Sequence, residues 1–174
     1  MLEIYDNLIP KNYLKDIQNY FLHGNAQWTY MPSMTYGDSN SDLDSFGFSI
    51  GICDGGIFQN TYAATLLKGL LYQIQEKTNR NKILRSRIDM TVYNPVGYRH
   101  DIHTDLPEEI DNITTIFYLN SSDGNTVLYD SKSSPIKEVE PIENRLLIFD
   151  GNIQHTGHSP SKSKCRVLIN SNFI

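Results

Sequence analysis

The chain has 174 residues, of which 39% are hydrophobic and 20% charged, and its formal net charge is -5 at pH 7. This length predicts one domain, residues 1–174, with a core of its own, and no run approaches the roughly 20 apolar residues that a membrane-spanning helix needs. The negative charge comes without a basic run, which argues against nucleic acid as the primary partner because proteins that grip phosphate backbones carry basic patches.

The two cysteines, Cys53 and Cys165, cannot form a disulfide framework. The first residues lack the basic flank and short apolar run of a secretion signal. We therefore expect a reducing, cytoplasmic setting and no contact with a membrane. The sequence does not indicate an oligomeric state.

Residues 1–82 are predicted to form helices and loops that support the rest of the domain. Apolar residues at helical spacing follow Pro10, which suits a helix start because its missing N–H has no partner there. A helix of about 12 residues is expected at this point. A second helix is predicted from Tyr62 to Glu76, where leucines form one stripe and Asn79 marks the end.

The segment from Tyr36 to Gly56 is rich in Ser, Gly, Asn and Asp and carries only weak strand signals near Phe46-Gly47-Phe48. It is predicted to be a long loop with short strands. Long loops in small domains are usually functional or disordered, so this one is a candidate lid over a site. The alternative is a solvated excursion with no role.

Residues 83–174 are predicted to form the β core, because short apolar runs there are separated by turn residues. The absence of intervening helical patterns favours a sandwich or barrel over a parallel sheet. The expected fold class is therefore α+β, mainly β, with N-terminal helices that buttress the β core. The predicted strands are Ile88 to Tyr93, Ile113 to Leu119, Thr126 to Tyr129, Leu146 to Phe149, and Arg166 to Asn170.

Two histidines and one carboxylate form the candidate metal site. In His103-Thr104-Asp105, residues two apart on an extended chain project to the same side and can bind one ion together. His155 follows the predicted strand Leu146 to Phe149, where a loop end can turn its imidazole inward. Two His and one carboxylate leave coordination positions open, as non-haem Fe(II) chemistry with dioxygen requires. The alternative is that these are surface or hydrogen-bonded structural residues.

Arg166 lies inside the apolar strand Cys165-Arg166-Val167-Leu168-Ile169. Arginine is rarely buried without a partner, and its planar guanidinium suits a carboxylate that accepts two hydrogen bonds. The sequence leaves two partners open: a bound anion, or an acidic side chain in a structural salt bridge.

These motifs, in this order, resemble the Fe(II)/2-oxoglutarate-dependent dioxygenases, especially their prolyl 4-hydroxylase-like branch. The similarity covers about 90 residues and includes Tyr93 to Tyr98, His103-Thr104-Asp105, a Gly124-Asn125-Thr126 hairpin, and His155-Thr156-Gly157 with Arg166. Prolyl hydroxylases usually have Lys at the last position, so Arg166 leaves the substrate class more open than the co-substrate.

The resemblance implies a double-stranded β-helix, a jelly-roll of the cupin type, with Fe(II) bound by His103, Asp105 and His155. It implies 2-oxoglutarate held by Arg166 and hydrogen-bonded by Tyr93, and ascorbate as a candidate reductant. The implied reaction hydroxylates an unactivated C–H bond and releases succinate and CO2. The substrate class expected first is a peptide or protein side chain, and small molecules are the alternative.

Three readings from the residues stay open beside this one. A cupin-like isomerase or binding barrel also places His and acidic residues around a metal, but usually with more histidines and without a buried arginine. A metal-free module could have kept the fold. Tyr93 could be an ordinary core residue of its strand.

Overall fold

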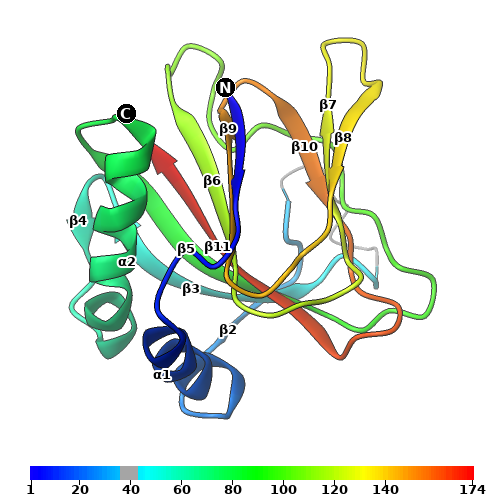
Figure 1. The fold of residues 1–174 in the computed structure, drawn as a ribbon. Helices are drawn as coiled ribbons and strands as arrows, with labels where there is room; N and C mark the ends of the chain where they lie inside the picture. Colours follow the sequence, from blue (N-terminus) through cyan, green and yellow to red (C-terminus); the bar gives the residue numbers. More distant parts are fainter. Residues whose placement is uncertain (36–42) are drawn as a thin grey trace.

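The computed structural model describes residues 1–35 and 43–174. Most of its elements are strands, and the two long helices both lie in the first half of the chain (Figure 1). In chain order the elements are β1 (Leu2–Tyr5), α1 (Lys11–Leu22), β2 (Thr29–Met31), β3 (Gly47–Asp54), β4 (Ile57–Phe58), α2 (Tyr62–Thr78), β5 (Ile83–Val92), β6 (Ile113–Tyr118), β7 (Thr126–Tyr129), β8 (Pro135–Val139), β9 (Arg145–Asp150), β10 (Gln154–Gly157) and β11 (Cys165–Phe173).

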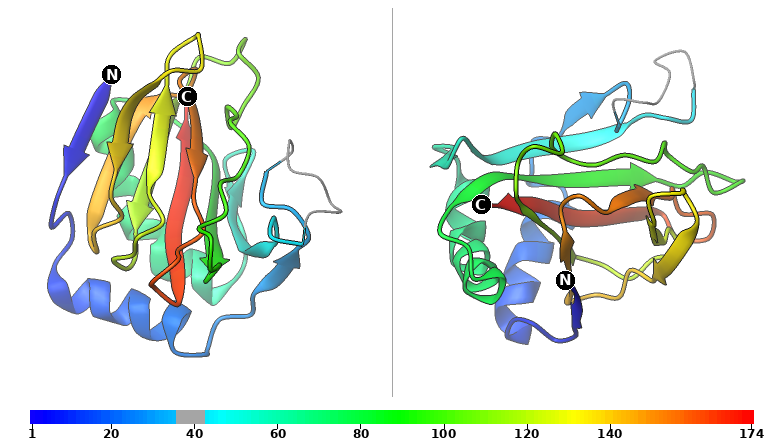
Figure 2. Two further views of the ribbon diagram at one scale, coloured as in Figure 1. Left: turned by 90° about the vertical axis from the view of Figure 1, so that its right-hand side faces the viewer. Right: turned by 90° about the horizontal axis from the view of Figure 1, so that it is seen from above.

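Two antiparallel sheets form the body of the domain. The large sheet has the order β1-β9-β6-β11-β5-β3-β2, with β4 paired to β3, and the small sheet has the order β10-β7-β8. Figure 1 shows α1 and α2 on one side of the large sheet and the small sheet on the other, and Figure 2 shows the same layers from two further sides. This arrangement is the jelly-roll with buttressing helices that the sequence predicts.

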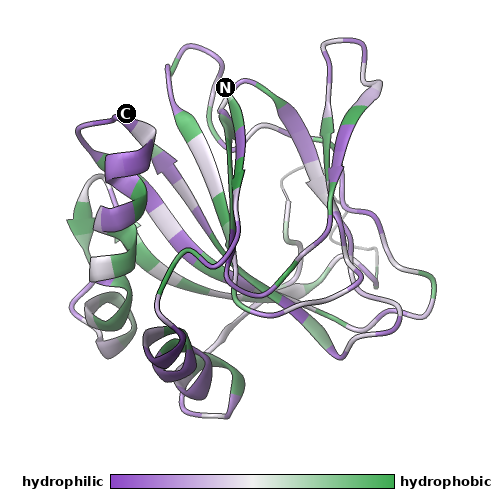
Figure 3. Cartoon of the chain, in the orientation of Figure 1, coloured by the Kyte–Doolittle hydropathy of each residue, from purple (hydrophilic) through white to green (hydrophobic). Residues whose placement is uncertain are grey.

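Apolar side chains on the central strands alternate between two hydrophobic cores, one on each face of the large sheet. On β11, Val167, Ile169 and Phe173 pack with the helices, whereas Leu168 belongs to a second cluster inside the sheets. Because successive side chains of a strand point to opposite faces, one strand can serve both cores. The hydropathy colours in Figure 3 show green on the central strands and purple on the exposed side of the helices.

Both predicted helices are present, close to the predicted limits. α1 buries Leu14, Ile17 and Phe21 against the large sheet. α2 begins where the Thr61 hydroxyl accepts a hydrogen bond from the Ala64 N–H at 3.1 Å. It ends at Asn79, whose φ of 53° is left-handed, a conformation that asparagine tolerates well.

Residues 1–82 contain more strand than the helices, loops and short strands predicted from the sequence, because β1, β2, β3 and β4 all join the large sheet. In particular, β3 is an eight-residue strand within the segment expected to be a lid. Its Gly and Ser residues are poor strand formers, but it is held by backbone hydrogen bonds to β5 and β2. Residues 36–42 of that segment lie outside the described residues.

The sequence does not predict β8 or β10, because both strands are short and neither shows an alternation of apolar and polar residues. In the described parts of the chain, no helix is long and apolar enough to cross a membrane.

Candidate active site

His103, Asp105 and His155 converge inside the jelly-roll, with one ligand atom from each within 4.8 Å of the others. The backbones of the two histidines pair directly: the His103 N–H donates to the His155 carbonyl at 3.0 Å, and the His155 N–H donates to the His103 carbonyl at 2.9 Å. Hence His155 lies in strand β10 and not on the loop expected from the sequence. This pairing fixes the two imidazoles side by side, with ring centroids 4.6 Å apart.

Both imidazoles turn the same nitrogen toward Asp105. The Nδ1 of His103 contacts the Asp101 carbonyl at 2.8 Å, and the Nδ1 of His155 contacts the Ile153 carbonyl at 3.4 Å. The Nε2 atoms lie 4.0 and 3.9 Å from Asp105 Oδ1. A hydrogen bond at Nδ1 orients an imidazole for metal binding through Nε2, so this donor set fits a transition metal such as Fe(II).

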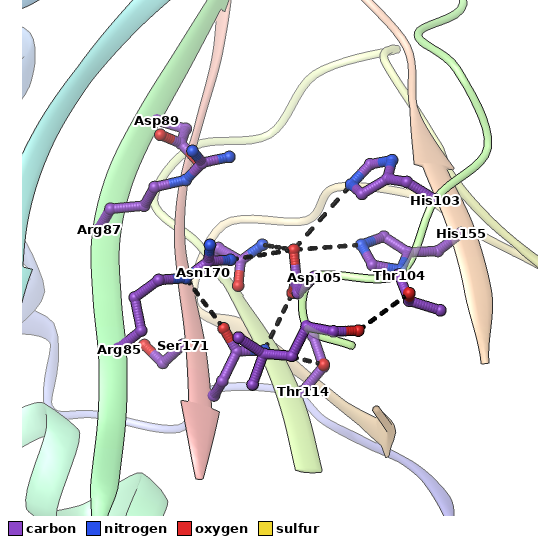
Figure 4. Close-up of polar contacts among 12 residues, drawn as sticks. Arg85, Arg87, Asp89, His103, Thr104, Asp105, Thr114, His155, Asn170 and Ser171 are labelled. Atoms are coloured by element: carbon purple, nitrogen blue, oxygen red, sulfur yellow. Dashed lines mark hydrogen bonds and ion pairs between the residues drawn. The ribbon is translucent and has the colours of Figure 1, made fainter. Parts of the chain in front are cut away.

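The Asp105 carboxylate is almost completely buried, since 2% of its side chain is exposed. Asn170 Nδ2 donates to Oδ1 at 3.2 Å, and Asn172 Nδ2 donates to Oδ2 at 3.1 Å. Arg85 Nη2 lies 3.2 Å from Oδ1 (Figure 4). Burial acts to raise the pKa of Asp105, but His155, Arg85 and other neighbours hold it at about 2. The group is therefore ionised, as a metal ligand must be.

Burial lowers the pKa of His155 to about 4, although Asp105 opposes that shift. The imidazole is therefore neutral at physiological pH, and a neutral imidazole has a lone pair for a metal ion.

A cavity extends from the histidines to Arg166 at the far end of the same space. It is bounded by side chains from β5, β6, β7, β10 and β11 and by the segment that follows β2. Its lining residues are Met34, Thr35, Arg87, Asp89, Thr91, His100, His103, Ile116, Thr126, His155, Gly157, Arg166, Leu168 and Asn170.

Arg166 is 6% exposed, and its Nη2 donates a hydrogen bond to Thr126 Oγ1 at 2.7 Å. The guanidinium Nε is buried without a hydrogen-bond partner. Among the described residues, no carboxylate lies within ion-pair distance of it, so the salt bridge considered from the sequence is not formed there. A buried cation without an anion is costly, which points to a bound anion as its partner.

Thr126 connects Arg166 to a second buried side chain. The Tyr118 hydroxyl donates to Thr126 Oγ1 at 2.7 Å, and Tyr118 also presents its ring 5.8 Å from the guanidinium carbon. A hydroxyl has two lone pairs and one proton. Because both lone pairs of Thr126 are in use, its own proton can be given to an anion in the cavity.

Gly124 and Gly157 lie against the Arg166 side chain and, having no side chain of their own, leave room for it. A Cβ added to Gly124 would come within 3.0 Å of the Arg166 Cδ and 2.3 Å of the His158 carbonyl oxygen, and one added to Gly157 would meet Arg166 Nη1 at 3.0 Å. Both glycines belong to the motifs that the sequence analysis singles out. Their role here is steric: a Cβ at Gly124 would clash with backbone, and one at Gly157 would push against the guanidinium.

Two further polar atoms of the cavity are buried without hydrogen-bond partners, Thr91 Oγ1 and Asn170 Oδ1. Thr91 pairs with Arg166 across β5 and β11, and the Asn170 amide contacts Asp105. Buried polar atoms are usually satisfied, so unsatisfied ones along this cavity mark space for a polar ligand. A small dicarboxylate such as 2-oxoglutarate fits this chemistry.

Tyr93 is not placed as the sequence suggested. It follows the end of β5, is 54% exposed, and is not among the residues that line the cavity. The buried tyrosine near Arg166 is Tyr118. His100 and His158, which lie near the candidate ligands in the sequence, are outside the three-residue cluster, although His100 is buried and lines the cavity.

The sequence reasoning missed the inner face of β5. Arg85, Arg87, Asp89 and Thr91 alternate with residues that face the opposite side of the sheet. Figure 4 shows Arg85 reaching from β5 toward Asp105, whereas Arg87 turns to Asp89 on the same strand. Polar residues at every second position of a buried strand were the available signal.

The sequence from residue 88 to 174 matches the model of the 2OG-Fe(II) oxygenase superfamily, which covers half of the chain. No curated protein matches the sequence.

Similar folds occur among solved structures of low sequence identity. A 2OG-Fe(II) oxygenase family oxidoreductase from Burkholderia pseudomallei has a TM-score of 0.74 at 12% identity, over 99% of this chain and 84% of that one. A prolyl hydroxylase from Trichoplax adhaerens, in complex with a peptide fragment of the hypoxia inducible factor oxygen degradation domain, has a TM-score of 0.70 at 15% identity, over 99% and 83%. A non-heme alpha ketoglutarate dependent epimerase from nogalamycin biosynthesis has a TM-score of 0.67 at 6% identity, over 99% and 76%.

These likenesses show a shared fold, and the family model matches the half of the chain that holds His103, Asp105, His155 and Arg166. Together with the double-stranded β-helix, they place this chain in the 2OG-Fe(II) oxygenase superfamily, whose members are enzymes that use Fe(II) and 2-oxoglutarate.

Proposed function

We propose that the protein is a hydroxylase in which His103, Asp105 and His155 bind Fe(II) and Arg166 binds the distal carboxylate of 2-oxoglutarate. Its substrate is an unactivated C–H bond in a peptide or protein side chain, and succinate and CO2 are released. The observation that carries the proposal is the position of Arg166. It is a buried cation without an acidic partner among the described residues, in the cavity that the candidate metal ligands also line.

When bound, Fe(II) and 2-oxoglutarate supply the oxidising chemistry. The protein's part is to hold both in one orientation. His103 and His155 offer their Nε2 atoms, Asp105 offers Oδ1, and the amides of Asn170 and Asn172 keep that carboxylate in place. Three protein ligands leave coordination positions for the co-substrate and oxygen.

At the other end of the cavity, Arg166 and the Thr126 hydroxyl can donate to a carboxylate. Ile116 and Leu168 line the same cavity and reduce the space for water between the two polar ends. The apolar contact and the buried cation together select a short aliphatic dicarboxylate over a monocarboxylate, because a monocarboxylate would leave Arg166 unpaired.

The substrate reaches the metal from a second cavity, which shares Met34, Thr35, Arg87 and His103 with the first. This outer cavity is bounded by the segment 31–35 on one side and by β5 on the other. The Trichoplax prolyl hydroxylase, which has the same fold, was solved with a peptide. That likeness supports a peptide or protein substrate here.

The test uses anaerobic protein loaded with Fe(II) and titrated with 2-oxoglutarate. Chelation of the metal by the oxo acid is followed through its charge-transfer absorption. Turnover is then followed as succinate release with pools of peptides, amino acids and nucleotides, and mass spectrometry identifies a product that has gained one oxygen atom.

The expected result is an absorption band that requires both metal and 2-oxoglutarate, and oxygen gain in a peptide pool. A protein that binds a metal but gives no such band would contradict the co-substrate assignment. Turnover confined to the amino-acid or nucleotide pool would leave the co-substrate in place and overturn the substrate class.

A further inference from the structure

Arg85 lies on the wall of the outer cavity, next to the candidate metal ligands. Its side chain is 23% exposed, and it lines this cavity together with Arg87, His103 and Asp105. Figure 4 shows Arg85 on β5, across from His103 and His155, with Asp105 between them. The guanidinium thus lies on the side from which a substrate approaches.

The anion that Arg85 contacts is the oxygen that a metal ion also needs. Arg85 Nη2 lies 3.2 Å from Asp105 Oδ1, and the same Oδ1 faces the Nε2 atoms of His155 and His103 at 3.9 and 4.0 Å. The Nε of Arg85 donates to Asn172 Oδ1 at 3.1 Å, which keeps the side chain along the strand. Arg85 and a metal ion bound by these ligands would therefore compete for the same oxygen, Asp105 Oδ1.

A divalent ion bound by these three ligands takes the stronger share of that oxygen's charge and repels the neighbouring guanidinium. Arg85 then carries a positive charge that Asp105 no longer balances. An anion that enters the outer cavity can restore the balance. This makes the site's affinity for such an anion dependent on the metal.

The other two arginines of these cavities have other anions. Arg87 Nε lies 2.8 Å from Asp89 Oδ2, and Arg166 is assigned above to the co-substrate. Arg85 is therefore the arginine whose positive charge loses most of its neutralising partner when a metal ion binds.

The opposite wall of the outer cavity supplies apolar surface. Met31 and Met34 line it, and methionine side chains pack on irregular aliphatic groups. An aliphatic carbon can thus lie against the thioethers while an attached acid group faces β5.

We propose that Arg85 binds a carboxylate of the substrate in the metal-loaded protein, so that the preferred substrate carries this carboxylate close to the carbon that is hydroxylated. This assignment rests on the proposed function, since it takes the outer cavity as the substrate side of an Fe(II) site. The carboxylate can belong to an Asp or Glu side chain, a peptide C-terminus or a free amino acid, and the experiment separates these sources.

The experiment measures binding without turnover. Protein loaded with Zn(II) and 2-oxoglutarate is titrated calorimetrically with a capped pentapeptide that has Asp at its centre and with the matching Asn peptide. Charge-assisted hydrogen bonds contribute more than neutral ones, so we expect the Asp peptide to bind about 10- to 100-fold more tightly. A peptide with a free C-terminus but no acidic side chain, and free aspartate, identify the source of the carboxylate.

In Arg85→Gln the preference for Asp over Asn should vanish, and in the metal-free wild type it should be reduced. Arg80→Gln is the matched control, because Arg80 makes an ion pair with Asp111 on the surface. Its preference should equal that of the wild type. Thermal unfolding of both variants shows whether either substitution alters the fold.

Zinc affinity provides a second readout. A residue that merely supported Asp105 would, when replaced, weaken metal binding by about 10- to 100-fold, as changes behind metal ligands typically do. Because Arg85 competes with the metal, Arg85→Gln should instead bind Zn(II) at least as tightly as the wild type.

Equal or absent binding of the Asp and Asn peptides in the wild type would overturn the assignment, as would a preference that persists in Arg85→Gln. Failure of the wild type to bind 2-oxoglutarate would overturn the proposed function instead. The same titration with Zn(II) alone would then still decide the role of Arg85.

Discussion

The two ends of the cavity system place their arginines in opposite situations. Arg166, at the inner end, is 6% exposed and has a hydroxyl but no acidic side chain among its described partners. Arg85, at the outer end, is partly exposed and contacts the buried carboxylate of Asp105. The inner end is therefore preformed for one anion, whereas the outer end becomes available to an anion only when a metal competes for Asp105.

This difference is built by neighbouring strands of one sheet. β11 carries Arg166 at its start and Asn170 and Asn172 farther along, while β5 carries Arg85 beside Asn172. Antiparallel pairing therefore brings the start of β5 next to the end of β11. The metal ligands lie between the two arginines and divide a closed subsite from an open one.

We expect the largest effect from removal of a metal ligand, because the metal site lies between the Arg166 end and the Arg85 end of the cavity system. His155→Ala should abolish detectable Fe(II) binding in anaerobic protein, measured by metal analysis after gel filtration, while the protein stays folded. The reason is that, within residues 1–35 and 43–174, the site has three ligand side chains and no fourth to replace a lost one.

His158→Ala is the control, because His158 lies three positions along the same segment but outside the cluster. It should retain the metal. Iron retained in His155→Ala and lost in His158→Ala would show that the ligand assignment is wrong.

The next effect tests the inner end alone. Arg166→Ala should weaken 2-oxoglutarate binding by roughly 2 to 5 kcal/mol, the range for truncating one side of a buried charge pair. Arg166→Lys should recover part of this loss, because lysine keeps the charge but not the paired hydrogen bonds of the guanidinium. The measurement is the charge-transfer titration.

Iron affinity should barely change in Arg166→Ala, which separates loss of the co-substrate from loss of the metal. Equal 2-oxoglutarate affinity in the wild type and Arg166→Ala would remove Arg166 from the site.

A smaller effect concerns the loop that connects β10, which carries His155, to β11, which carries Arg166. Asp123 accepts hydrogen bonds from the backbone N–H groups of Ser161, Lys162 and Ser163, all at 2.9 Å. Burial acts to raise the pKa of Asp123, but these donors outweigh it and hold the pKa well below its ordinary range. Asp123→Asn should lower the free energy of unfolding at pH 7 by about 1 kcal/mol, a modest effect because the carboxylate is partly exposed to solvent.

Because the folded-state pKa is depressed, the stabilisation is present above the unfolded pKa of about 3.9 and is lost as the pH falls toward the folded value. The difference between the wild type and Asp123→Asn, measured by urea unfolding, should therefore shrink below about pH 3.9. Asp111→Asn, which alters an exposed ion pair, serves as the control. A difference that does not change with pH would exclude the carboxylate as its source.

The smallest expected effect is that of Tyr93→Phe, because Tyr93 lies at neither the Arg166 end nor the Arg85 end of the cavity system. Tyr93 is 54% exposed and does not line the cavity, so 2-oxoglutarate affinity should stay within about 0.5 kcal/mol of the wild type, the usual range for surface changes. Tyr118→Phe removes the hydroxyl that contacts Thr126 and should weaken binding measurably. If Tyr93→Phe weakened 2-oxoglutarate binding more than Tyr118→Phe did, Tyr93 would have to be counted among the binding residues.

Much of the site could be predicted from the sequence because its signals are local. The pair His103 and Asp105 is recognisable from a spacing of two, and Arg166 stands out as a cation within an apolar strand. The strands β6, β7, β9 and β11 are recognisable because buried strands have nearly continuous apolar runs. The helix ends at Pro10 and Asn79 follow from the backbone preferences of those residues.

The sequence by itself determined which side chains are chemically able to bind a metal ion or an anion, since charge and residue type do not depend on the fold. Only the tertiary structure decided which of them meet. β2, β3 and β10 form because segments farther along or back in the chain supply their hydrogen-bond partners, and their local sequence patterns are weak. Tyr93 faces outward, and Arg85 reaches Asp105 across 20 positions of sequence. These outcomes depend on strand register and on where each strand ends, because a shift of one residue turns every side chain to the other face of the sheet.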